Sequence, residues 1–463
     1  MLTFEWIAAA VEGKLHHPDP TVQVSKFSID TRTLRPGDFF IALVGTRTDG
    51  HCFLTDAFAQ AASGALIHYL DSVEFLPAHW RNVILVDNTL HALHRLAKAY
   101  RALFQIPIVA VTGSSGKTTT KELIAHMLSE RWRVYRSSGN LNSEYGLPLA
   151  LLEMPRETEI SVFELGMQRM GDIRQLAEIL RPTIGVITMI GDAHREFFES
   201  QEQIAQSKWE LIEALPTDGI AVLNRDSVYL RERDFSGRMI WFGLESEEAA
   251  YRVGQMDTAH LEGLQFKVET LGEVFKIQTK LLGRHNAINI LAACAVAHER
   301  GVTIREIQQA LRSFPLVPHR MELKESSLGW ILDDSYNANP AAVKEALRTL
   351  NELKVIGCRK IFVLGEMREL GKQSANAHRE IGQAIADSEV DRVFLLGEMT
   401  LHTADYLVRE ASWNDERVIV TQSQSELLRL IQSRLFGTQH LILVKGSRAN
   451  ELDKIVETLT HRA

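Results

Sequence analysis

Hydrophobic and polar positions repeat along this chain with the two periods that distinguish helices from strands. In residues 89–104, Leu90, Leu93 and Leu96 recur at helical intervals, and the apolar run 106–111 that follows has the length of a buried strand. Strands that alternate with helices form parallel sheets covered by helices, so the predicted fold class is α/β. Further strands are predicted at 161–164, 185–190, 221–223, 330–332, 361–364, 392–396 and 441–444.

Three interruptions of this alternation indicate the domain organisation. Residues 1–84 combine short apolar runs with turn signals such as Pro36-Gly37, and the less regular section 240–282 predicts additional β structure. Pro315 and Pro318 break the pattern again and predict a linker. Because 463 residues exceed what one hydrophobic core usually supports, several domains are expected. We predict three domains, at residues 1–84, 85–314 and 315–463.

The composition narrows the class of protein. Hydrophobic residues make up 45% and charged residues 24%, which is typical of a soluble globular chain, and the net charge of -8 gives no basic surface for nucleic acid. The 3 cysteines lie far apart, so neither a disulfide framework nor a zinc site is predicted. The chain start lacks the pattern of a secretory signal, and no uncharged apolar stretch reaches the roughly 18 residues of a membrane span. We therefore expect a cytoplasmic protein; the sequence carries no signal for its oligomeric state, for which a monomer is the expectation.

Residues 112–119, with the sequence TGSSGKTT, lie between a predicted strand and a predicted helix. Glycines let backbone N–H groups form a concave nest for phosphate, and the helix N-terminus adds partial positive charge. Lys117 can then reach the β- and γ-phosphates, and the Thr118 hydroxyl can bind Mg²⁺. Val111 replaces the first glycine of the general pattern, so this is a shorter variant, and a plain Gly/Ser-rich turn is the alternative. The candidate nucleotide-binding residues are Gly113, Ser114, Ser115, Gly116, Lys117, Thr118 and Thr119.

This loop resembles the nucleotide loop of the Mur ligases and of the related folylpolyglutamate synthetases. Segments 139–148 (GNLNSEYGLP), 333–340 (DDSYNANP), 363–371 and 444–448 (VKGSR) are similar to one branch of the Mur ligases, the MurF type. At the N-terminus, segments 30–32, 36–38 and 49–51 resemble the UDP-sugar-binding domain of that branch. The resemblance covers nearly the whole chain. It implies a three-domain Mur ligase architecture with a central P-loop parallel sheet and a C-terminal Rossmann-like domain.

The resemblance also implies an activity. Enzymes of this branch are ATP-dependent, Mg²⁺-requiring amide ligases that join D-alanyl-D-alanine to UDP-N-acetylmuramoyl tripeptide through an acyl phosphate, in peptidoglycan precursor synthesis. Another Mur or folylpolyglutamate-type ligase with a different amino acceptor is the nearest alternative, and segment 333–340 favours the MurF type over it. A P-loop ATPase that acts as a switch is an alternative of a different class.

Two polar residues follow predicted strands where a metal could bind. Glu164 ends the strand 161–164, and the carboxyl ends of parallel strands face the crevice where ligands bind. His194 lies just past the strand 185–190. From spacing alone, a solvated strand end and an ordinary loop residue stay open as alternatives. The resemblance implies that Thr118, Glu164 and His194 are Mg²⁺ ligands, although histidine is a less usual ligand for this ion.

Lys208 lies on the apolar face of a predicted helix over 201–215, between Ile204 and Leu211. A lysine there either extends its amine to the surface or is held inside. Burial lowers the pKa of a lysine, and a neutral amine reacts with CO₂ to form a carbamate. The resemblance implies such a carbamylated lysine near Mg²⁺, although Met189 stands where an asparagine is usual. The candidate catalytic residues are Lys117, Lys208 and His194.

The remaining candidates contact the base, the phosphates or the peptide. Asn286 and Asn289 lie one turn apart before a helix predicted at 290–299; the resemblance implies adenine contacts, and helix capping by Asn286 is the alternative. Arg320 and Asp334 match positions that approach the nucleotide when the C-terminal domain closes, although the family pattern has glycine where this chain has His319. Substrate contacts are implied at Asp30, Thr31, Arg32, Asn140, Asn142 and Arg448.

Overall fold

The computed structural model describes residues 2–46, 48–68, 77, 79–191, 196–414 and 416–461. The chain packs into two compact units. The first unit comprises residues 1–110, 133–167 and 171–183, and the second comprises residues 111–132, 168–170 and 184–463. Both units combine helices with strands, which confirms the α/β class. The division into three domains stays a prediction.

The first unit begins with a small five-stranded sheet in the order β1-β5-β4-β3-β2. Its strands are parallel except for the β1–β5 pair. Phe40, Ala65 and Ile67 form part of its buried core. The strands are β1 (Lys14–His16), β2 (Phe27–Ser28), β3 (Phe39–Ile41), β4 (Gly64–Ile67) and β5 (Val83–Leu85). The helices here are α1 (Phe4–Val11), the 3₁₀ turn η1 (Gly50–Phe53) and α2 (Leu54–Ala59).

The rest of the first unit contains the helix predicted at 89–104. This helix, α3 (Thr89–Arg101), begins where the Asn88 side chain accepts a hydrogen bond from the His91 N–H, and it buries Leu93 and Leu96. It packs against α5 (Gly146–Leu152) and α6 (Asp172–Leu180). The strands β7 (Val134–Arg136) and β8 (Ile160–Glu164) pair in parallel, and β6 (Ile108–Thr112) crosses from the first unit into the second.

In the second unit, six strands pair in the order β14-β13-β12-β11-β10-β9. The pairs from β9 to β12 are parallel and those from β12 to β14 are antiparallel, so the additional β structure predicted at 240–282 is present. The strands are β9 (Ile184–Ile187), β10 (Ile220–Asn224), β11 (Arg238–Gly243), β12 (Tyr251–Asp257), β13 (Gln265–Thr270) and β14 (Val274–Gln278). The helices are α4 (Lys117–Leu128), α7 (Gln201–Glu213), α8 (Arg284–Glu299) and α9 (Ile304–Ser313).

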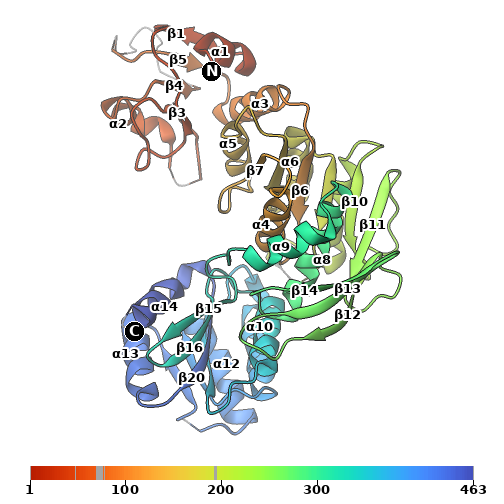
Figure 1. Cartoon of the computed structure of the whole chain (residues 1–463). Helices are drawn as coiled ribbons and strands as arrows, with labels where there is room; N and C mark the ends of the chain where they lie inside the picture. The colour runs from red at the N-terminus through yellow and green to blue at the C-terminus, as the bar shows by residue number, and fades with distance from the viewer. Residues whose placement is uncertain are drawn as a thin grey trace. The chain divides into compact units, whose positions relative to one another are not determined.

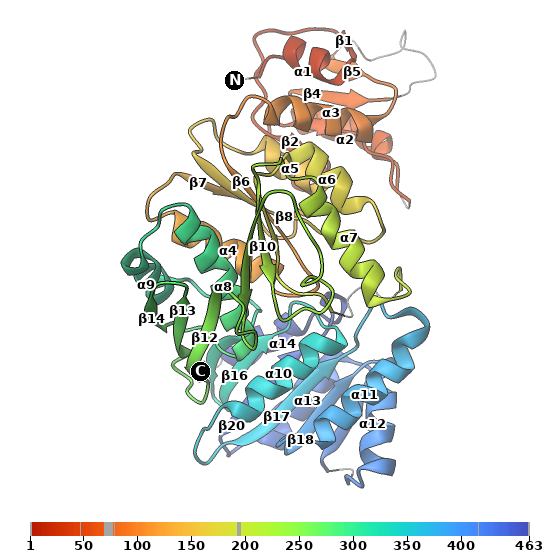
Figure 2. The same ribbon diagram turned by 90° about the vertical axis from the view of Figure 1, so that its right-hand side faces the viewer.

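The C-terminal part of the second unit is a six-stranded sheet in the order β15-β16-β20-β17-β18-β19, parallel except for β15. Helices cover both of its faces (Figures 1 and 2). The strands are β15 (Glu322–Ser326), β16 (Gly329–Asp334), β17 (Arg359–Gly365), β18 (Arg392–Leu396), β19 (Val418–Thr421) and β20 (His440–Lys445). The helices are α10 (Pro340–Glu352), η3 (Gly371–Gln373), α11 (Ser374–Ala386), η4 (Glu398–Thr400), α12 (Leu401–Asp405), η5 (Tyr406–Glu410), α13 (Gln424–Leu435), η6 (Arg448–Asn450) and α14 (Leu452–Thr460).

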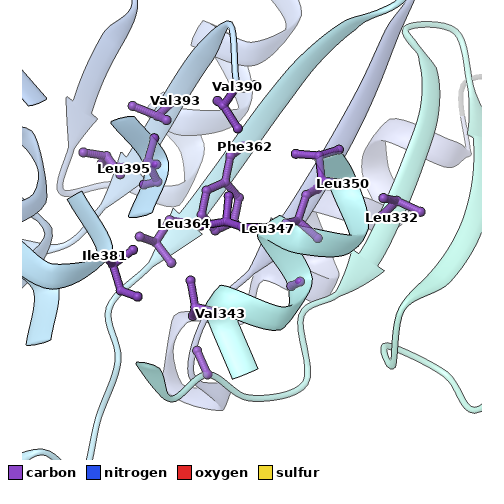
Figure 3. Close-up of a cluster of buried hydrophobic side chains, with 14 of the residues drawn as sticks. Leu332, Val343, Leu347, Leu350, Phe362, Leu364, Ile381, Val390, Val393 and Leu395 are labelled. Atoms are coloured by element: carbon purple, nitrogen blue, oxygen red, sulfur yellow. The ribbon is translucent and has the colours of Figure 1, made fainter. Parts of the chain in front are cut away.

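Successive residues of β17 enter different cores, as the pleat of a strand requires. Phe362 and Leu364 pack with α10 and α11 (Figure 3), whereas Ile361 and Val363 pack with α13 and α14. A strand that is buried on both faces is continuously apolar. That is why the run 361–364 predicts a strand but shows no alternation of polar and apolar residues.

Two predicted boundaries were wrong. The strand predicted at 185–190 ends at Ile187, and the helix predicted at 290–299 already begins at Arg284. Asn286 therefore lies inside α8 and does not cap it; the cap position is Gly283. Among the described residues, no helix is both long enough and apolar enough to cross a membrane.

Phe362→Ala should lower the free energy of unfolding by about 3–5 kcal/mol, because it leaves a cavity at a fully buried position. Phe436→Ala is the matched control: this side chain is 85% exposed, so its loss should change the free energy by less than about 0.5 kcal/mol. Urea denaturation of both variants measures the difference. Equal losses would contradict the described core.

Candidate functional site

The loop between β6 and α4 has the strand–loop–helix context that the sequence predicts. Gly116 precedes the first residue of α4 with φ +81°, a left-handed conformation that favours glycine. A Cβ at Gly116 would lie 2.3 Å from Oδ1 of Asn289, and a Cβ at Gly113 would lie 1.9 Å from Oγ1 of Thr188. The loop therefore needs glycine at both positions, and its shape leaves backbone N–H groups at the start of a helix.

The residues that follow β9 brace this loop. The Ser114 hydroxyl donates to the carbonyl of Gly191 at 2.9 Å and accepts from the Gly191 N–H at 2.9 Å. The Thr188 hydroxyl donates to the carbonyl of Ser115 at 2.6 Å. Sequence reasoning missed Thr188, which it included in an apolar strand. The available signal was a polar residue at the carboxyl end of that strand, where ligands bind in parallel sheets.

Three polar side chains open α4. The Lys117 amine donates to the carbonyl of Gly113 at 2.9 Å, so it folds back over the loop. The Thr118 hydroxyl accepts from Nη2 of Arg320 at 3.4 Å. Thr119 is only 7% exposed. Arg320 was predicted to lie near the nucleotide. The structure places its side chain beside the loop, although it is far from the loop in sequence.

Arg320 also lies 4.0 Å above the ring of Tyr336, a distance that favours a cation–π interaction. Asp334, the last residue of β16, forms a partly buried ion pair with Lys445, which also donates to the carbonyl of Asn337 at 3.0 Å. Tyr336 and Lys445 were not among the predicted site residues. Tyr336 lies in segment 333–340 and Lys445 in segment 444–448, which resemble the Mur ligases. Their partners, Arg320 and Asp334, lie outside the same short segment, so no local pattern indicates these contacts.

Asn286 and Asn289 lie together on α8, both almost fully buried. Nδ2 of Asn289 donates to Oδ1 of Asn286 at 2.9 Å, and Oδ1 of Asn289 accepts from the Thr120 hydroxyl at 3.2 Å. Nδ2 of Asn286 donates to the carbonyl of Leu282 at 2.8 Å. The two amides are thus aligned by each other and by α4. Their predicted contact with adenine stays a prediction.

Lys208 is 1% exposed on α7, so the amphipathic pattern located it correctly on the buried face. Burial lowers its pKa well below the ordinary value for a lysine, and the positive charge of Lys117 lowers it further. A lysine amine with a lowered pKa is a nucleophile near neutral pH.

Glu164 ends β8 in the first unit and is 3% exposed. Nδ2 of Asn142 donates to its Oε1 at 2.7 Å, and the hydroxyl of Ser137 accepts from its N–H at 3.3 Å. Asn140 is exposed. A buried carboxylate oriented by an amide suits a hard cation such as Mg²⁺, as does the Thr118 hydroxyl. His194 lies outside the described residues.

The predicted substrate contacts include two exposed arginines. Arg32, whose side chain is 87% exposed, pairs with Asp30 at 2.6 Å, and its hydrogen bonds lower the pKa of that carboxyl. Thr31 between them is partly buried. Arg448 pairs with Asp453 at 2.6 Å and remains 59% exposed. Both guanidinium groups thus lie at the surface with carboxylate partners beside them. Their roles stay predictions.

Two family models match most of this chain. The Mur ligase middle domain matches residues 111–297, which contain the phosphate loop, Lys208 and both asparagines of α8. The Mur ligase, glutamate ligase domain matches residues 319–448, which begin just before Arg320.

Curated proteins and solved structures show the same likeness along nearly the full length. A protein of Bacillus subtilis named UDP-N-acetylmuramoyl-tripeptide--D-alanyl-D-alanine ligase is 34% identical over 99% of this chain and 98% of its own length. A protein of the same name from Escherichia coli is 32% identical over 99% and 98%. The crystal structure of MurF from Acinetobacter baumannii superposes with a TM-score of 0.87 and 26% identity, covering 99% of this chain and 98% of that one. MurF ligase from Thermotoga maritima, solved in complex with ADP, has a TM-score of 0.81 and 27% identity over 94% and 97%.

Gly116→Ala should destabilise the chain more than Gly171→Ala. Both glycines have left-handed backbones, but a Cβ at Gly171 meets nothing within 4 Å, whereas one at Gly116 displaces the Asn289 amide from its hydrogen bonds. We expect the free energy of unfolding of Gly116→Ala to fall by at least about 1 kcal/mol more. Denaturant titration of the two variants measures this difference. An equal loss would mean that Asn289 moves aside without cost.

Proposed function

This chain belongs to the Mur ligase family, and on that premise we propose that it joins D-alanyl-D-alanine to UDP-N-acetylmuramoyl tripeptide at the expense of ATP. One observation carries the proposal. Over 99% of its length the chain is 34% and 32% identical to two proteins named UDP-N-acetylmuramoyl-tripeptide--D-alanyl-D-alanine ligase. The intact phosphate loop and the buried Lys208 support it.

The reaction consists of two transfers. The terminal carboxylate of the tripeptide attacks the γ-phosphorus of ATP, which breaks the bond to the β-phosphate oxygen and gives ADP and an acyl phosphate. The amine of D-alanyl-D-alanine then attacks the acyl carbon, loses a proton, and expels inorganic phosphate as the amide forms. The protein contributes mainly by positioning the reactants and neutralising charge, because phosphoryl transfer needs little covalent chemistry from side chains.

Three features of this chain would neutralise that charge. The N–H groups at the start of α4 face the phosphates, as in other anion sites at helix N-termini. Lys117 extends its ammonium over the same loop from the first residue of the helix. Arg320 adds a second cation beside Thr118. A guanidinium presents several donors in a plane, which suits phosphate oxygens.

We propose that Thr118 and Glu164 hold Mg²⁺, with His194 as the third predicted ligand. A hydroxyl and a carboxylate are hard oxygen donors, which fit this ion. When bound, Mg²⁺ supplies further neutralisation of phosphate charge. In the first unit, Asn142 keeps the Glu164 carboxylate in one orientation.

We also propose that Lys208 reacts with CO₂ to form a carbamate. The neutral amine adds to the carbon of CO₂ and releases one proton, so an uncharged amine in the interior becomes an anion. The lowered pKa of Lys208 supports this step, because only the neutral amine has the lone pair for it. The resulting carboxylate-like group would favour the binding of Mg²⁺. The cytoplasmic location and the monomeric state stay predictions.

Release of phosphate should require both substrates together. UDP-N-acetylmuramoyl tripeptide alone, D-alanyl-D-alanine alone and neither should each give only a background rate, and free D-alanine should replace the dipeptide poorly. A coupled phosphate assay measures all five conditions. Equal rates with free D-alanine would favour another branch of Mur ligases, and rapid hydrolysis with neither substrate would favour an ATPase switch.

Lys208→Arg should be as inactive as Lys208→Ala, because arginine keeps the positive charge but forms no carbamate. Removal of CO₂ and bicarbonate should lower the activity of the unmodified chain reversibly, which tests the idea without any substitution. Formate or acetate should restore part of the activity of Lys208→Ala by replacing the lost anion. Thermal unfolding of each variant controls for misfolding at this buried position. A fully active Lys208→Arg variant would exclude the carbamate.

A further inference from the structure

Arg320 lies in a turn with an unusual backbone. The residues on both sides of it, His319 and Met321, have φ of +61° and +54°, a left-handed conformation that side chains with a Cβ rarely adopt. Such strain persists only where the surroundings enforce it, and it is common at functional sites. The turn between the predicted linker and β15 must therefore be stabilised by contacts with residues outside the turn.

A buried carboxylate holds this turn. Asp333, the second-last residue of β16, is fully buried, and its Oδ2 accepts from Nδ1 of His319 at 2.9 Å and from the Lys324 amine at 2.7 Å. Its Oδ1 accepts from the hydroxyl of Ser335. Burial opposes the charge on Asp333, but the hydrogen bonds from Lys324 and Ser335 outweigh it, and the pKa of this carboxyl lies below its ordinary value. An ionised, immobile acceptor thus fixes the imidazole.

The backbone of His319 has further partners. Its N–H donates to Oε2 of Glu322 at 3.4 Å, and its carbonyl accepts from the N–H of Tyr336 at 3.2 Å. Tyr336 in turn lies under the guanidinium of Arg320 at 4.0 Å. The side chain and the N–H of His319 are therefore hydrogen-bonded to β16 and β15, and its carbonyl is hydrogen-bonded to the segment that follows β16.

We propose that His319 is a positioning residue: its hydrogen bond to Asp333 locks the left-handed turn that directs Arg320 toward the phosphates of ATP at Thr118. Glycine adopts the left-handed conformation without strain, and histidine does not. In this chain the hydrogen bond from the His319 side chain to Asp333, called the tether below, holds the backbone in that conformation. The inference rests on the proposed function in one respect, that ATP binds at the loop beside Thr118.

The test compares two substitutions that both remove the imidazole. His319→Ala loses the tether and keeps the strain, so the turn relaxes, and we expect kcat/KM for ATP to fall by about tenfold. His319→Gly loses the tether but adopts the left-handed turn freely, so it should recover to within about threefold of the unmodified chain. The change should lie in KM for ATP and leave KM for D-alanyl-D-alanine unaltered. A merely structural role predicts that both substitutions change the free energy of unfolding and leave KM for ATP unaltered, since stability at a left-handed position depends on the residue and not on the ligand.

Two controls make the comparison specific. Ser412→Gly relieves a left-handed residue, φ +57°, elsewhere in the second unit and should leave KM for ATP unchanged. In an Arg320→Ala background, His319→Ala should have no further effect on KM for ATP, because His319 acts through Arg320. If His319→Gly is no better than His319→Ala, if the two losses add in the double variant, or if Ser412→Gly alters KM for ATP as much, the proposal is overturned.

Affinity for a non-hydrolysable ATP analogue, measured by calorimetry without acceptor, separates this proposal from the proposed function. We expect the affinity for the analogue to be highest for the unmodified chain, lower for His319→Gly and lowest for His319→Ala. This order supports the positioning role even if phosphate release requires another acceptor. In that case only the proposed substrates are wrong. If the unmodified chain does not bind the analogue, both proposals are overturned.

Discussion

The shape of the loop between β6 and α4 depends on one steric constraint, the absence of a Cβ at Gly113 and Gly116. At each position a Cβ would occupy the place of a polar side chain, Thr188 in one case and Asn289 in the other. Those two side chains reach the loop from the residue after β9 and from α8, so the loop is fixed by the packing of the second unit. A loop held in this way keeps the N–H groups at the start of α4 in one place, and a helix N-terminus with such N–H groups binds anions.

Two buried ionisable side chains, Asp333 and Lys208, respond to the free-energy cost of burying a charge in opposite ways. Asp333 stays ionised because Lys324, His319 and Ser335 donate hydrogen bonds to it. Lys208 instead has its pKa lowered by burial and by the charge of Lys117, which favours the neutral amine. The first group therefore provides rigidity and the second provides reactivity. Both consequences follow from the chemistry of the neighbouring residues, since the degree of burial is similar.

The turn at His319 shows that a residue with a side chain can occupy a left-handed position when a partner holds it. Glycine at that position would give the required conformation by its own freedom. Here a histidine adopts the same conformation because Asp333 lies at hydrogen-bonding distance. The hydrogen bond to Asp333 therefore stabilises a conformation that glycine would adopt without such a partner.

The sequence by itself determined the α/β class, the phosphate loop and the buried face on which Lys208 lies, because periodicity, glycine and residue type act over a few neighbouring positions. Fold and site were predictable to that extent, while the start of α8 and the end of β9 were not, since element ends depend on capping and packing. Only the tertiary structure decided that Thr188 braces the loop and that His319 meets Asp333 and brings Arg320 to Thr118. These contacts join distant segments, and no local pattern encodes which side chains the packing of a sheet brings together.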